Sequence, residues 1–277
     1  MFQGMTNVSI VTYKTASAEL ARCIETLNSN RVNRIYIIDN SREKRIEKLC
    51  TQYENVTYIA CENRGYGAGH NIAIRKSIAE NADYHLVMNS DVTFGDTVIE
   101  QLTEYMNRRQ DVAQVQPNIV YPDGKAQYTC RLLPSPADLI FRRFMPAYIS
   151  RKNDERYLLK FFDHQSEADI PYHQGSFMLF RTKCFEKTGL FDERFFMYPE
   201  DIDITRRMHQ HYRTMFVPIA TVVHCHQAAS YRSFRMTMVH IVNMIRYFNK
   251  WGWFFDKERK RVNKETIEAI RKAMRQP

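Results

Sequence analysis

Asp91 is the residue of the first half of the chain that is best placed for chemistry. It comes three residues after the apolar run Tyr84–Met88, and Asn89 and Ser90 lie between them. A carboxylate at the end of a buried strand must be hydrogen-bonded, solvated or bound to a metal. As a hard oxygen ligand, Asp91 could connect a divalent cation to a diphosphate. Its position would equally suit a cap of the next turn.

A second group of carboxylates stands next to aromatic residues. Glu200, Asp201 and Asp203 follow a segment, residues 191–198, that is rich in Phe and Tyr. A carboxylate in such surroundings can act as a general base for an alcohol. Two arginines come one turn later, so the acids could instead stabilise a helix N-terminus and pair with those arginines. This second role suits Asp203 in either case.

Two histidines follow an apolar run near the end of the part of the chain that we expect to be α/β. His224 and His226 come after Val217–Val223 and would share one face of a strand. One of them could complete a metal site with Asp91. Ordinary polar roles are the alternative for such an isolated pair.

Asp39 stands at the end of another apolar run, Ile35–Ile38. Its carboxylate could accept a hydrogen bond from the imide N–H of a nucleobase. The sequence Asp-Asn-Ser is also a common turn, and the side chain could serve only that turn.

The segment 63–71 is rich in glycine and opens a predicted helix. Glycine allows the backbone to approach a phosphate, and a helix N-terminus favours anions. The spacing is not that of a dinucleotide-binding fingerprint, because His70 stands where the pattern would place the next glycine. Taken alone, this segment is a weak indicator of a phosphate site.

These residues require a scaffold in which short apolar runs alternate with helical periodicity. We expect strands at 8–12, 35–38, 56–60, 84–88 and 112–115, and helices at 19–27, 42–53, 69–80 and 96–106. Alternation of this kind predicts a mainly parallel, doubly wound α/β sheet. Ligands of such sheets bind beyond the carboxyl ends of the strands, which is where the polar clusters fall.

The second half of the chain is less regular. Residues 131–170 are rich in Phe, Tyr, Arg and Pro and predict an irregular functional region. We then expect a strand at 173–181 that contains Gly175, a helix at 202–211 and a strand at 217–223. The last 45 or so residues are basic and aromatic, and we expect them to be helical.

Together, these clusters resemble family 2 glycosyltransferases of the GT-A fold, in particular their bacterial rhamnosyltransferase-like branch. The resemblance covers about residues 6–250 and rests on motifs in the family's order. These are Val11-Thr12-Tyr13, Ile38-Asp39-Asn40-Ser41, Asn63-Arg64-Gly65 through Asn71, Asn89-Ser90-Asp91, Gly175-Ser176-Phe177-Met178, Gly189-Leu190-Phe191-Asp192-Glu193 through Glu200-Asp201-Ile202-Asp203, and His224 with Ser230. It implies a catalytic domain at 1–228, with a nucleotide-binding half at about 5–116 and an acceptor-side half at about 117–228. A basic aromatic helical tail would occupy 229–277.

The resemblance also implies a role for each matching residue. Nucleoside contacts would come from Thr12, Tyr13 and Asp39. The nucleotide-sugar site would be lined by Asn63, Arg64, Gly65, Asn71, Asn89 and Ser90. Asp91 and His224 would hold Mg²⁺ or Mn²⁺, with His226 as a competitor of His224. Asp201 would be the base that deprotonates the acceptor, with Glu200 as the second choice. Asn89 replaces the first aspartate of the family's DxD element, so only Asp91 of that element is anionic.

The implied reaction is inverting transfer of a sugar from a nucleotide-diphosphate donor to a hydroxyl group. The branch favours L-rhamnose from dTDP-rhamnose, and UDP-linked hexoses stay open. The implied acceptor is a cell-surface glycan or a polyprenyl-diphosphate-linked one, as in polysaccharide biosynthesis of the cell envelope. A sugar-1-phosphate nucleotidyltransferase is a rival interpretation, but it needs a glycine- and arginine-rich loop where Thr12-Tyr13-Lys14-Thr15 stands. The second rival interpretation is a non-catalytic nucleotide-sugar-binding protein of the same fold.

Composition sets outer limits on these interpretations. The 277 residues include 44% hydrophobic residues and carry a net charge of +9, and the six cysteines form no CxxC pair. We expect reduced, mostly buried thiols. No apolar run reaches the ~20 residues that span a bilayer, and no secretory signal is recognisable, so we expect a cytoplasmic protein. Basic residues alternate with aromatic ones at 141–157 and 246–261, which suits an anionic membrane surface, a structural role or nucleic acid. The family's lipid-linked acceptors favour peripheral contact with the inner face of the cytoplasmic membrane, and no nucleic acid partner is expected.

Overall fold

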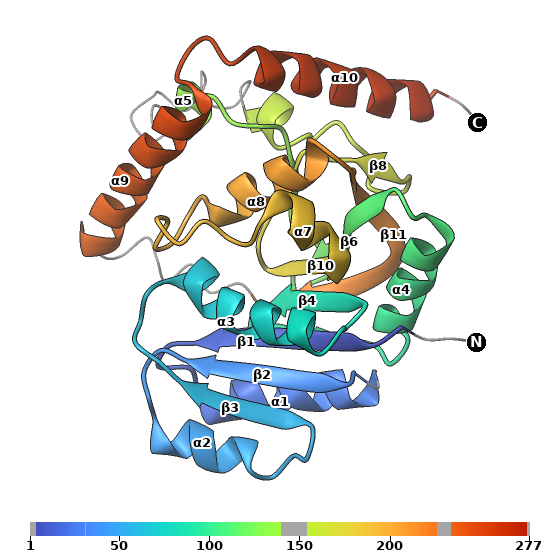
Figure 1. The fold of residues 1–277 in the computed structure, drawn as a ribbon. Helices are drawn as coiled ribbons and strands as arrows, with labels where there is room; N and C mark the ends of the chain where they lie inside the picture. The colour runs from blue at the N-terminus through green and yellow to red at the C-terminus, as the bar shows by residue number, and fades with distance from the viewer. Residues whose placement is uncertain (1–3, 31, 140–153, 226–233, 276–277) are drawn as a thin grey trace.

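The computed structural model of the chain describes residues 4–30, 32–139, 154–225 and 234–275. His226, Ser230 and most of the basic aromatic segment at 141–157 lie outside these residues. The described chain forms a mixed sheet flanked by helices, with two further helices at the C-terminal end (Figure 1). All six cysteines are free thiols, and four of them are buried.

The N-terminal half of the chain forms the parallel part of the sheet. Strands β1 (Thr6–Thr12), β2 (Arg34–Asp39), β3 (Val56–Ala60) and β4 (Tyr84–Met88) lie in the order β3-β2-β1-β4. Helices α1 (Ser17–Ser29), α2 (Lys44–Cys50) and α3 (Tyr66–Ala79) connect them. All four strands were expected. The second helix is shorter than the expected 42–53, because Asp39 and the residues after it form a turn that delays its start.

Strand side chains alternate between the two faces of the sheet. Ile35 and Ile37 pack in the same cluster as Leu20 and Leu27 of α1, whereas Tyr36 packs on the other face with residues of α3. This two-residue period and the apolar stripe of α1 are the patterns that predicted both elements. The helices therefore cover both faces and leave the strand ends to carry polar groups.

The second half of the chain adds antiparallel strands. The sheet continues from β4 in the order β10-β6-β11-β5, and β8 pairs with β11. The bounds are β5 (Val92–Phe94), α4 (Val98–Arg108), β6 (Val112–Val120), β8 (Ala168–Asp169), β10 (Phe177–Arg181), η2 (Thr182–Cys184), α7 (Phe185–Thr188), α8 (Glu200–His209) and β11 (Arg213–His224). β10 runs antiparallel to both of its neighbours. The short β5 and β8 were not expected, because two or three residues show no periodicity.

The expected strand at 173–181 is divided in two. β9 (Tyr172–His173) pairs with β7 (Cys130–Arg131) in a small separate sheet, and β10 begins only at Phe177. Gly175 lies in the gap, where its N–H donates to Asp201 and not to a neighbouring strand. The division therefore places a backbone donor at the acidic cluster.

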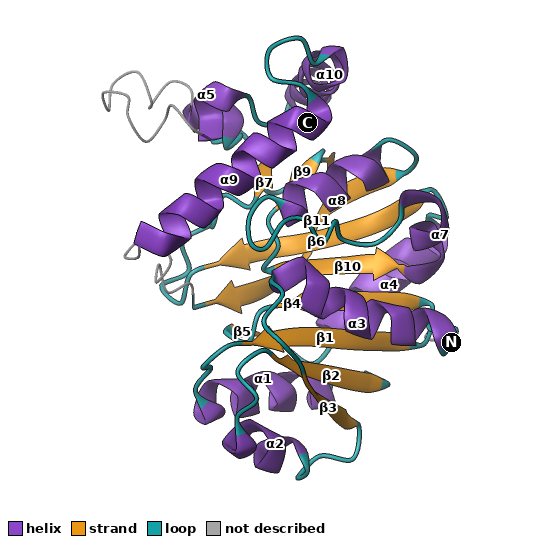
Figure 2. Ribbon diagram, turned by 60° about the vertical axis from the view of Figure 1, so that its left-hand side comes forward, coloured by secondary structure: helices purple, strands orange, loops and turns teal. Residues whose placement is uncertain are grey.

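The C-terminal tail is helical, as expected, and belongs to the core of the second half. Helices α9 (Phe234–Trp251) and α10 (Lys257–Ala273) lie beside the short α5 (Pro136–Leu139) along the outer edge of the molecule (Figure 2). Tyr247, Phe248, Val262 and Ile270 share a hydrophobic cluster with residues of 130–216. Much of the aromatic content of the tail is therefore structural.

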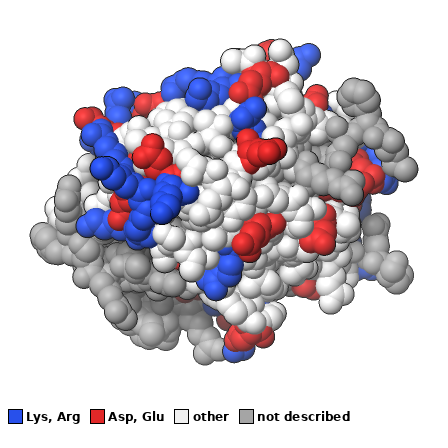
Figure 3. All heavy atoms as spheres, turned by 90° about the horizontal axis from the view of Figure 1, so that it is seen from below, with Lys and Arg blue, Asp and Glu red and all other residues white. Residues whose placement is uncertain are grey.

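The tail is also tied to α8 by ion pairs. Arg206 Nη1 and Nη2 donate to both carboxylate oxygens of Asp256, at 2.7 and 2.9 Å, and Arg206 also pairs with Glu258. Asp203 bonds Arg207 four residues on and the tail residue Trp251. The expected pairing of Asp203 with an arginine is thus confirmed. Charge elsewhere is uneven: Figure 3, which views the molecule from below, shows Lys and Arg gathered along one margin.

Candidate active site

Asp91 and His224 meet at one edge of the sheet. Asp91 lies in the turn between β4 and β5, and His224 is the last residue of β11, paired in register with Val92. Asp91 Oδ1 lies 3.3 Å from His224 Nε2, and the Cys225 N–H donates to the Asp91 carbonyl. The imidazole is buried, whereas the Asp91 side chain is 17% exposed. The pair therefore combines a buried imidazole with a carboxylate that is partly accessible.

Gln127 fixes which imidazole nitrogen carries hydrogen. Its Nε2 donates to the His224 carbonyl at 2.8 Å, so its Oε1 faces His224 Nδ1, also at 2.8 Å. Nδ1 is then the donor, and Nε2 faces Asp91 Oδ1 and, at 3.5 Å, Asn89 Nδ2. A proton or a metal cation can be shared between Nε2 and the Asp91 carboxylate.

This arrangement fits a divalent metal ion. A carboxylate oxygen and an imidazole nitrogen oriented from behind are a typical ligand pair. Among the described residues, no group of three or more His, Cys, Asp or Glu side chains could hold a metal. A bound diphosphate and water could supply further ligands, as expected for a site whose ion is shared with the substrate, and His226, the expected competitor of His224, lies outside the described residues.

Asp201 lies in the first turn of α8 and is held by three donors. Its Oδ2 accepts from the Gly175 N–H at 3.0 Å and from the Tyr172 hydroxyl at 3.3 Å, and its Oδ1 accepts from the Ile202 N–H at 2.8 Å. Burial raises the pKa of Asp201 above its usual value, although the Gly175 N–H and the positive charge of Arg131 oppose that rise. Such a carboxylate is oriented and more basic than a solvated one.

Glu200 is chemically different from its neighbour. Its side chain is buried, and its Oε2 has no hydrogen-bond partner among the described residues. Burial, and then the negative charge of Asp201, raise the pKa of Glu200 well above the usual range. Adjacent carboxylates with such different surroundings divide the roles of acid and base. Asp201 is the better supplied with donors and is therefore the member that ionises first.

Tyr66 connects the two centres. Its hydroxyl lies 2.7 Å from the Gly175 carbonyl and 2.9 Å from Asn89 Oδ1. Burial, followed by the negative charges of Glu200, Asp201 and Asp91, raises the pKa of the Tyr66 hydroxyl well above its usual value. Of the two groups that the Tyr66 hydroxyl contacts, Gly175 also donates its N–H to Asp201, and Asn89 Nδ2 lies 3.5 Å from His224 Nε2. The metal-type pair and the acidic pair belong to one site.

The glycines of segment 63–71 serve close packing. Gly65 has φ +106°, and a Cβ there would lie 2.1 Å from the Phe196 carbonyl oxygen. A Cβ on Gly67 would meet Phe191 at 2.9 Å, and one on Gly69 would meet Val11 at 2.7 Å. Gly65 and Gly67 thus allow the segment that leads to Glu200 and Asp201 to rest against the start of α3, and Gly69 allows α3 to pack on β1. The expected contact of this glycine segment with a nucleotide-sugar stays a prediction.

Asn71 is also used for positioning. It is fully buried, its Nδ2 donates to the Phe191 carbonyl and to Glu193, and its Oδ1 accepts from the Phe191 N–H. In the structure the Asn71 amide holds the segment before α8, and its expected contact with a nucleotide-sugar stays a prediction. The two nitrogen hydrogens and one oxygen lone pair of Asn71 are occupied within the chain.

Asp39 is likewise fully engaged by its own chain. Its carboxylate is buried and accepts from five donors: the Ser41 and Glu43 N–H groups and the hydroxyls of Ser41, Thr12 and Tyr58. Burial alone would raise the pKa of Asp39, but the hydrogen bonds from Glu43 and Ser41 lower it. The turn interpretation of Asp-Asn-Ser thus describes the structure, and the carboxylate shapes the end of β2.

The remaining residues that we predicted to contact the nucleotide-sugar fall into an exposed group and a group bonded within the chain. Tyr13 is 55% exposed and Arg64 is exposed, so both are accessible to a ligand. Thr12 is buried behind Asp39, and Asn63 Oδ1 accepts from Asn40 and from the Gly65 N–H. Ser90 donates to Glu19 at 2.6 Å.

Four residues of the site were not singled out from the sequence. They are Tyr66, Gln127, Arg131 and Tyr172. Tyr66 lies inside the glycine-rich segment, so its place there was a usable signal. Gln127 and Tyr172 reach the site from irregular segments, where no periodicity indicates the direction of a side chain.

Comparison with known proteins agrees with this geometry. The sequence model of the family described as Glycosyl transferase family 2 matches residues 8–189. The N-acetylglucosaminyl-diphospho-decaprenol L-rhamnosyltransferase of Mycobacterium tuberculosis (strain H37Rv) is 29% identical over 242 residues, 80% of this chain and 76% of that protein. Rhamnosyltransferase WbbL of Escherichia coli K12 is 25% identical over 240 residues, 82% of this chain and 87% of the relative.

Solved structures show the same fold. GalNAc-T7 with UDP, GalNAc and Mn²⁺ has a TM-score of 0.58 at 16% identity, over 80% of this chain and 44% of that one. The mannosyltransferase PcManGT of Pyrobaculum calidifontis, in complex with GDP-Man and Mn²⁺, also has a TM-score of 0.58, at 14% identity, over 88% of this chain and 65% of that one. The chain thus spans less than two thirds of either solved chain. The expected mixed, mainly parallel GT-A sheet with C-terminal helices is confirmed.

Proposed function

Because this chain belongs to glycosyl transferase family 2, we propose that it is an inverting, metal-dependent glycosyltransferase. The donor that we propose is dTDP-L-rhamnose, and the acceptor is a hydroxyl group of a glycan carried on a polyprenyl diphosphate. Two relatives named as rhamnosyltransferases support the sugar, and the diphospho-decaprenol in the name of one supports the acceptor. The single observation that carries the proposal is the convergence of Asp91, His224 and Asp201 around Tyr66.

The leaving group explains the first half of the site. Departure of a nucleoside diphosphate builds negative charge on phosphate oxygens, and a bound Mg²⁺ or Mn²⁺ would neutralise it. Asp91 Oδ1 and His224 Nε2 would hold that ion, while Gln127 keeps the imidazole in the required tautomer. Asn89 is fixed beside them by the Tyr66 hydroxyl.

The acceptor explains the second half. An alcohol has a high pKa, so a positioned base must remove its proton as the new bond forms. Asp201 can do so because the Gly175 N–H and the Tyr172 hydroxyl hold Oδ2 in place. Burial and the charge of Asp201 raise the pKa of Glu200 well above its usual range, which favours the neutral form of Glu200 beside Asp201. A single in-line displacement of this kind inverts the anomeric centre.

Peripheral contact with an anionic membrane is part of the proposal. Residues 229–277 contain twelve Lys and Arg against four Asp and Glu, a net +8 of the chain's +9. Phe254 and Phe255, between α9 and α10, are 65% and 89% exposed. Basic residues beside exposed aromatics favour anionic lipid surfaces. In the described residues, no helix has the length and apolarity needed to cross a bilayer.

The reaction is tested by incubating the protein with dTDP-L-rhamnose, Mn²⁺ and a polyprenyl-diphosphate-linked N-acetylglucosamine. We expect release of dTDP that depends on the acceptor, and a product whose anomeric configuration, read by NMR, is opposite to that of the donor. UDP-glucose in place of dTDP-rhamnose tests the sugar and the base. Retained configuration, or turnover that is equal with EDTA and with Mn²⁺, would refute the mechanism.

A further inference from the structure

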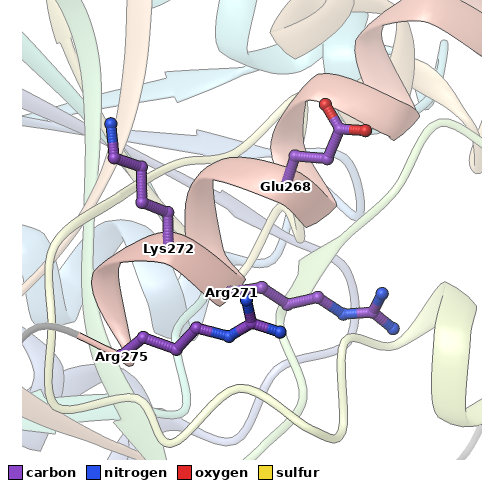
Figure 4. A pocket seen from close by; sticks show the side chains of 4 residues that line it. All are labelled: Glu268, Arg271, Lys272 and Arg275. Carbon is purple, nitrogen blue, oxygen red and sulfur yellow. The ribbon is translucent and has the colours of Figure 1, made fainter.

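A basic hollow lies next to the acidic segment of the site. Its volume is about 450 Å³, and it is lined by Arg194, Phe195, Arg246, Asn249 and Lys250; we call it the α9 hollow. None of these five lining residues is acidic. A second hollow, of about 350 Å³, is lined only by Glu268, Arg271 and Lys272 of α10 and by Arg275 just after it (Figure 4). Only the α9 hollow has donors from two parts of the chain.

Arg246 supplies a positive charge that no carboxylate neutralises. Its Nη1 donates to the Arg194 carbonyl at 2.7 Å and to Asn243 Oδ1 at 3.1 Å. No ion pair of Arg246 exists among the described residues. A guanidinium fixed by neutral acceptors keeps its remaining N–H groups and its full charge for an anion.

Asn249 is oriented as a donor. Its Oδ1 accepts from Trp253 Nε1 at 2.8 Å, so its NH₂ group is the end that remains. Lys250 and Arg194 both pair with Asp192, at 2.9 and 2.6 Å, and this shared partner fixes their position. Lys250 also pairs with Asp203 at 2.7 Å, and Asp203 is shared with Arg207. These two carboxylates thus face three cations, and Arg246 adds a fourth positive charge, so the surroundings of the hollow keep an excess of positive charge.

The hollow is coupled to the catalytic segment through α9. Asn243 Nδ2 donates to the Met197 carbonyl at 2.9 Å, and Arg246 holds the Arg194 carbonyl. The stretch between these two carbonyls leads directly to Glu200 and Asp201. An anion in the α9 hollow would therefore lie beside the segment that presents the base, at a place separate from the Asp91–His224 pair.

We propose that the α9 hollow binds a phosphate or diphosphate group. Planar guanidinium groups and an amide donor match the oxygens of such an anion. The group belongs either to the diphosphate of the acceptor or to a lipid headgroup. The binding of the anion stands on the lining residues alone, and only its assignment to the acceptor rests on the proposed function.

Titration calorimetry with inorganic pyrophosphate, on the full chain in EDTA, tests the site without any catalytic turnover. We expect Arg246→Gln to weaken pyrophosphate binding at least about tenfold, the loss of one hydrogen bond to a charged group. Arg246→Lys should recover part of the affinity because it retains the charge. Asn249→Asp is a second variant that leaves the Arg194 carbonyl contact intact, and its new carboxylate should also weaken binding. Lys272→Gln, in the α10 hollow, is the matched control and should bind as the unsubstituted chain does.

Two further arms separate the sources of the anion. A raised KM of Arg246→Gln for the lipid-diphosphate acceptor, with unchanged sedimentation on phosphatidylglycerol vesicles, assigns the group to the acceptor. Weaker sedimentation on phosphatidylglycerol vesicles, with phosphatidylcholine vesicles as reference and an unchanged KM, assigns it to a headgroup. Pyrophosphate affinities of Arg246→Gln and Asn249→Asp equal to that of Lys272→Gln would overturn the site, whatever the outcome of the transfer assay.

Discussion

The carboxylate of Asp201 is the group on which transfer depends. Replacing Asp201 with Asn retains the shape and the hydrogen bonds that oxygen can accept, but it removes the basic oxygen. We expect transfer to fall by about a factor of 10²–10⁴, the usual contribution of a general base. The affinity for dTDP, measured by calorimetry in the presence of Mn²⁺, should be unchanged because the nucleotide is expected to contact residues other than Asp201. If Glu200→Gln causes the larger loss and Asp201→Asn transfers normally, the two roles must be exchanged.

The hydroxyl of Tyr172 should set the pH at which Asp201 works. This hydroxyl donates to Asp201 Oδ2, and a bond to the ionised form lowers a pKa. Tyr172→Phe therefore raises the pKa of Asp201, and the acidic limb of the kcat/KM profile moves to higher pH. The control is Tyr105→Phe. It removes a similar hydrogen bond, from the Tyr105 hydroxyl to the Glu167 carboxylate, which does not involve Asp201. An unmoved acidic limb in Tyr172→Phe would contradict this role.

Sequence patterns identified the polar residues but not their use. Asp91, Asp201 and His224 were placed correctly at strand and helix ends, because periodicity shows where an element stops. The carboxylate of Asp39 accepts hydrogen bonds from backbone groups of its own turn, and the amide of Asn71 bonds backbone groups of a segment distant in sequence. Those partners are set by tertiary packing, which no local pattern reveals. Tyr172 and Gln127 escaped notice for the same reason.

Gly65, just before α3, packs against Phe196 of the segment that leads to Glu200 and Asp201. We expect that no side chain fits at position 65. Gly65→Ala adds a Cβ 2.1 Å from the Phe196 carbonyl oxygen at a φ of +106°. We expect a loss of more than about 2 kcal/mol in unfolding free energy, since strain at such a φ alone costs about 1–3 kcal/mol. Transfer should fall as well, because the segment that carries Asp201 must shift.

Gly124 offers a control for backbone strain alone. It also has a positive φ, +82°, but nothing lies within 4 Å of a Cβ there. In urea titrations, Gly124→Ala should lose clearly less stability than Gly65→Ala and should keep its activity. Equal losses in the two variants would show that φ, and not the contact with Phe196, explains the requirement for glycine.

Elements of the parallel half followed from sequence better than those of the other half. β1 to β4 and α1 have long apolar periods, whereas β5, β7, β8 and β9 have only two or three residues each. Short strands are formed by their neighbours in the sheet and not by their own pattern. The gap at Gly175, which supplies a donor to Asp201, could not be distinguished from a continuous strand.

The tail holds the molecule together through a buried ion pair. The Arg206 and Asp256 side chains are each only 3% exposed and join α8 to the start of α10. Asp256→Asn leaves a buried guanidinium poorly compensated, and we expect a loss of about 3–5 kcal/mol in urea unfolding. Arg261→Gln breaks an exposed pair with Glu265 and should cost less than about 1 kcal/mol. Similar losses in both would show that the tail does not stabilise the core.

The same pair predicts an acid-sensitive contribution to stability. Burial alone would raise the pKa of Asp256, but hydrogen bonds, first from Arg206, lower it below its usual value. A carboxyl group with a lowered pKa stabilises the fold above its unfolded pKa of about 3.9 and loses that contribution as the pH falls further. The stability difference between the unsubstituted chain and Asp256→Asn should therefore be constant near neutrality and shrink below about pH 4.

The site as a whole depends on a cation held by Asp91 and His224 across from Asp201. Electron paramagnetic resonance of Mn²⁺, titrated in the presence of dTDP, measures that cation without any transfer. We predict tight binding to the unsubstituted chain and to Asp201→Asn, and at least about tenfold weaker binding to His224→Ala, the loss expected for one ligand. Equal Mn²⁺ affinity in the three proteins would contradict the assignment of the site.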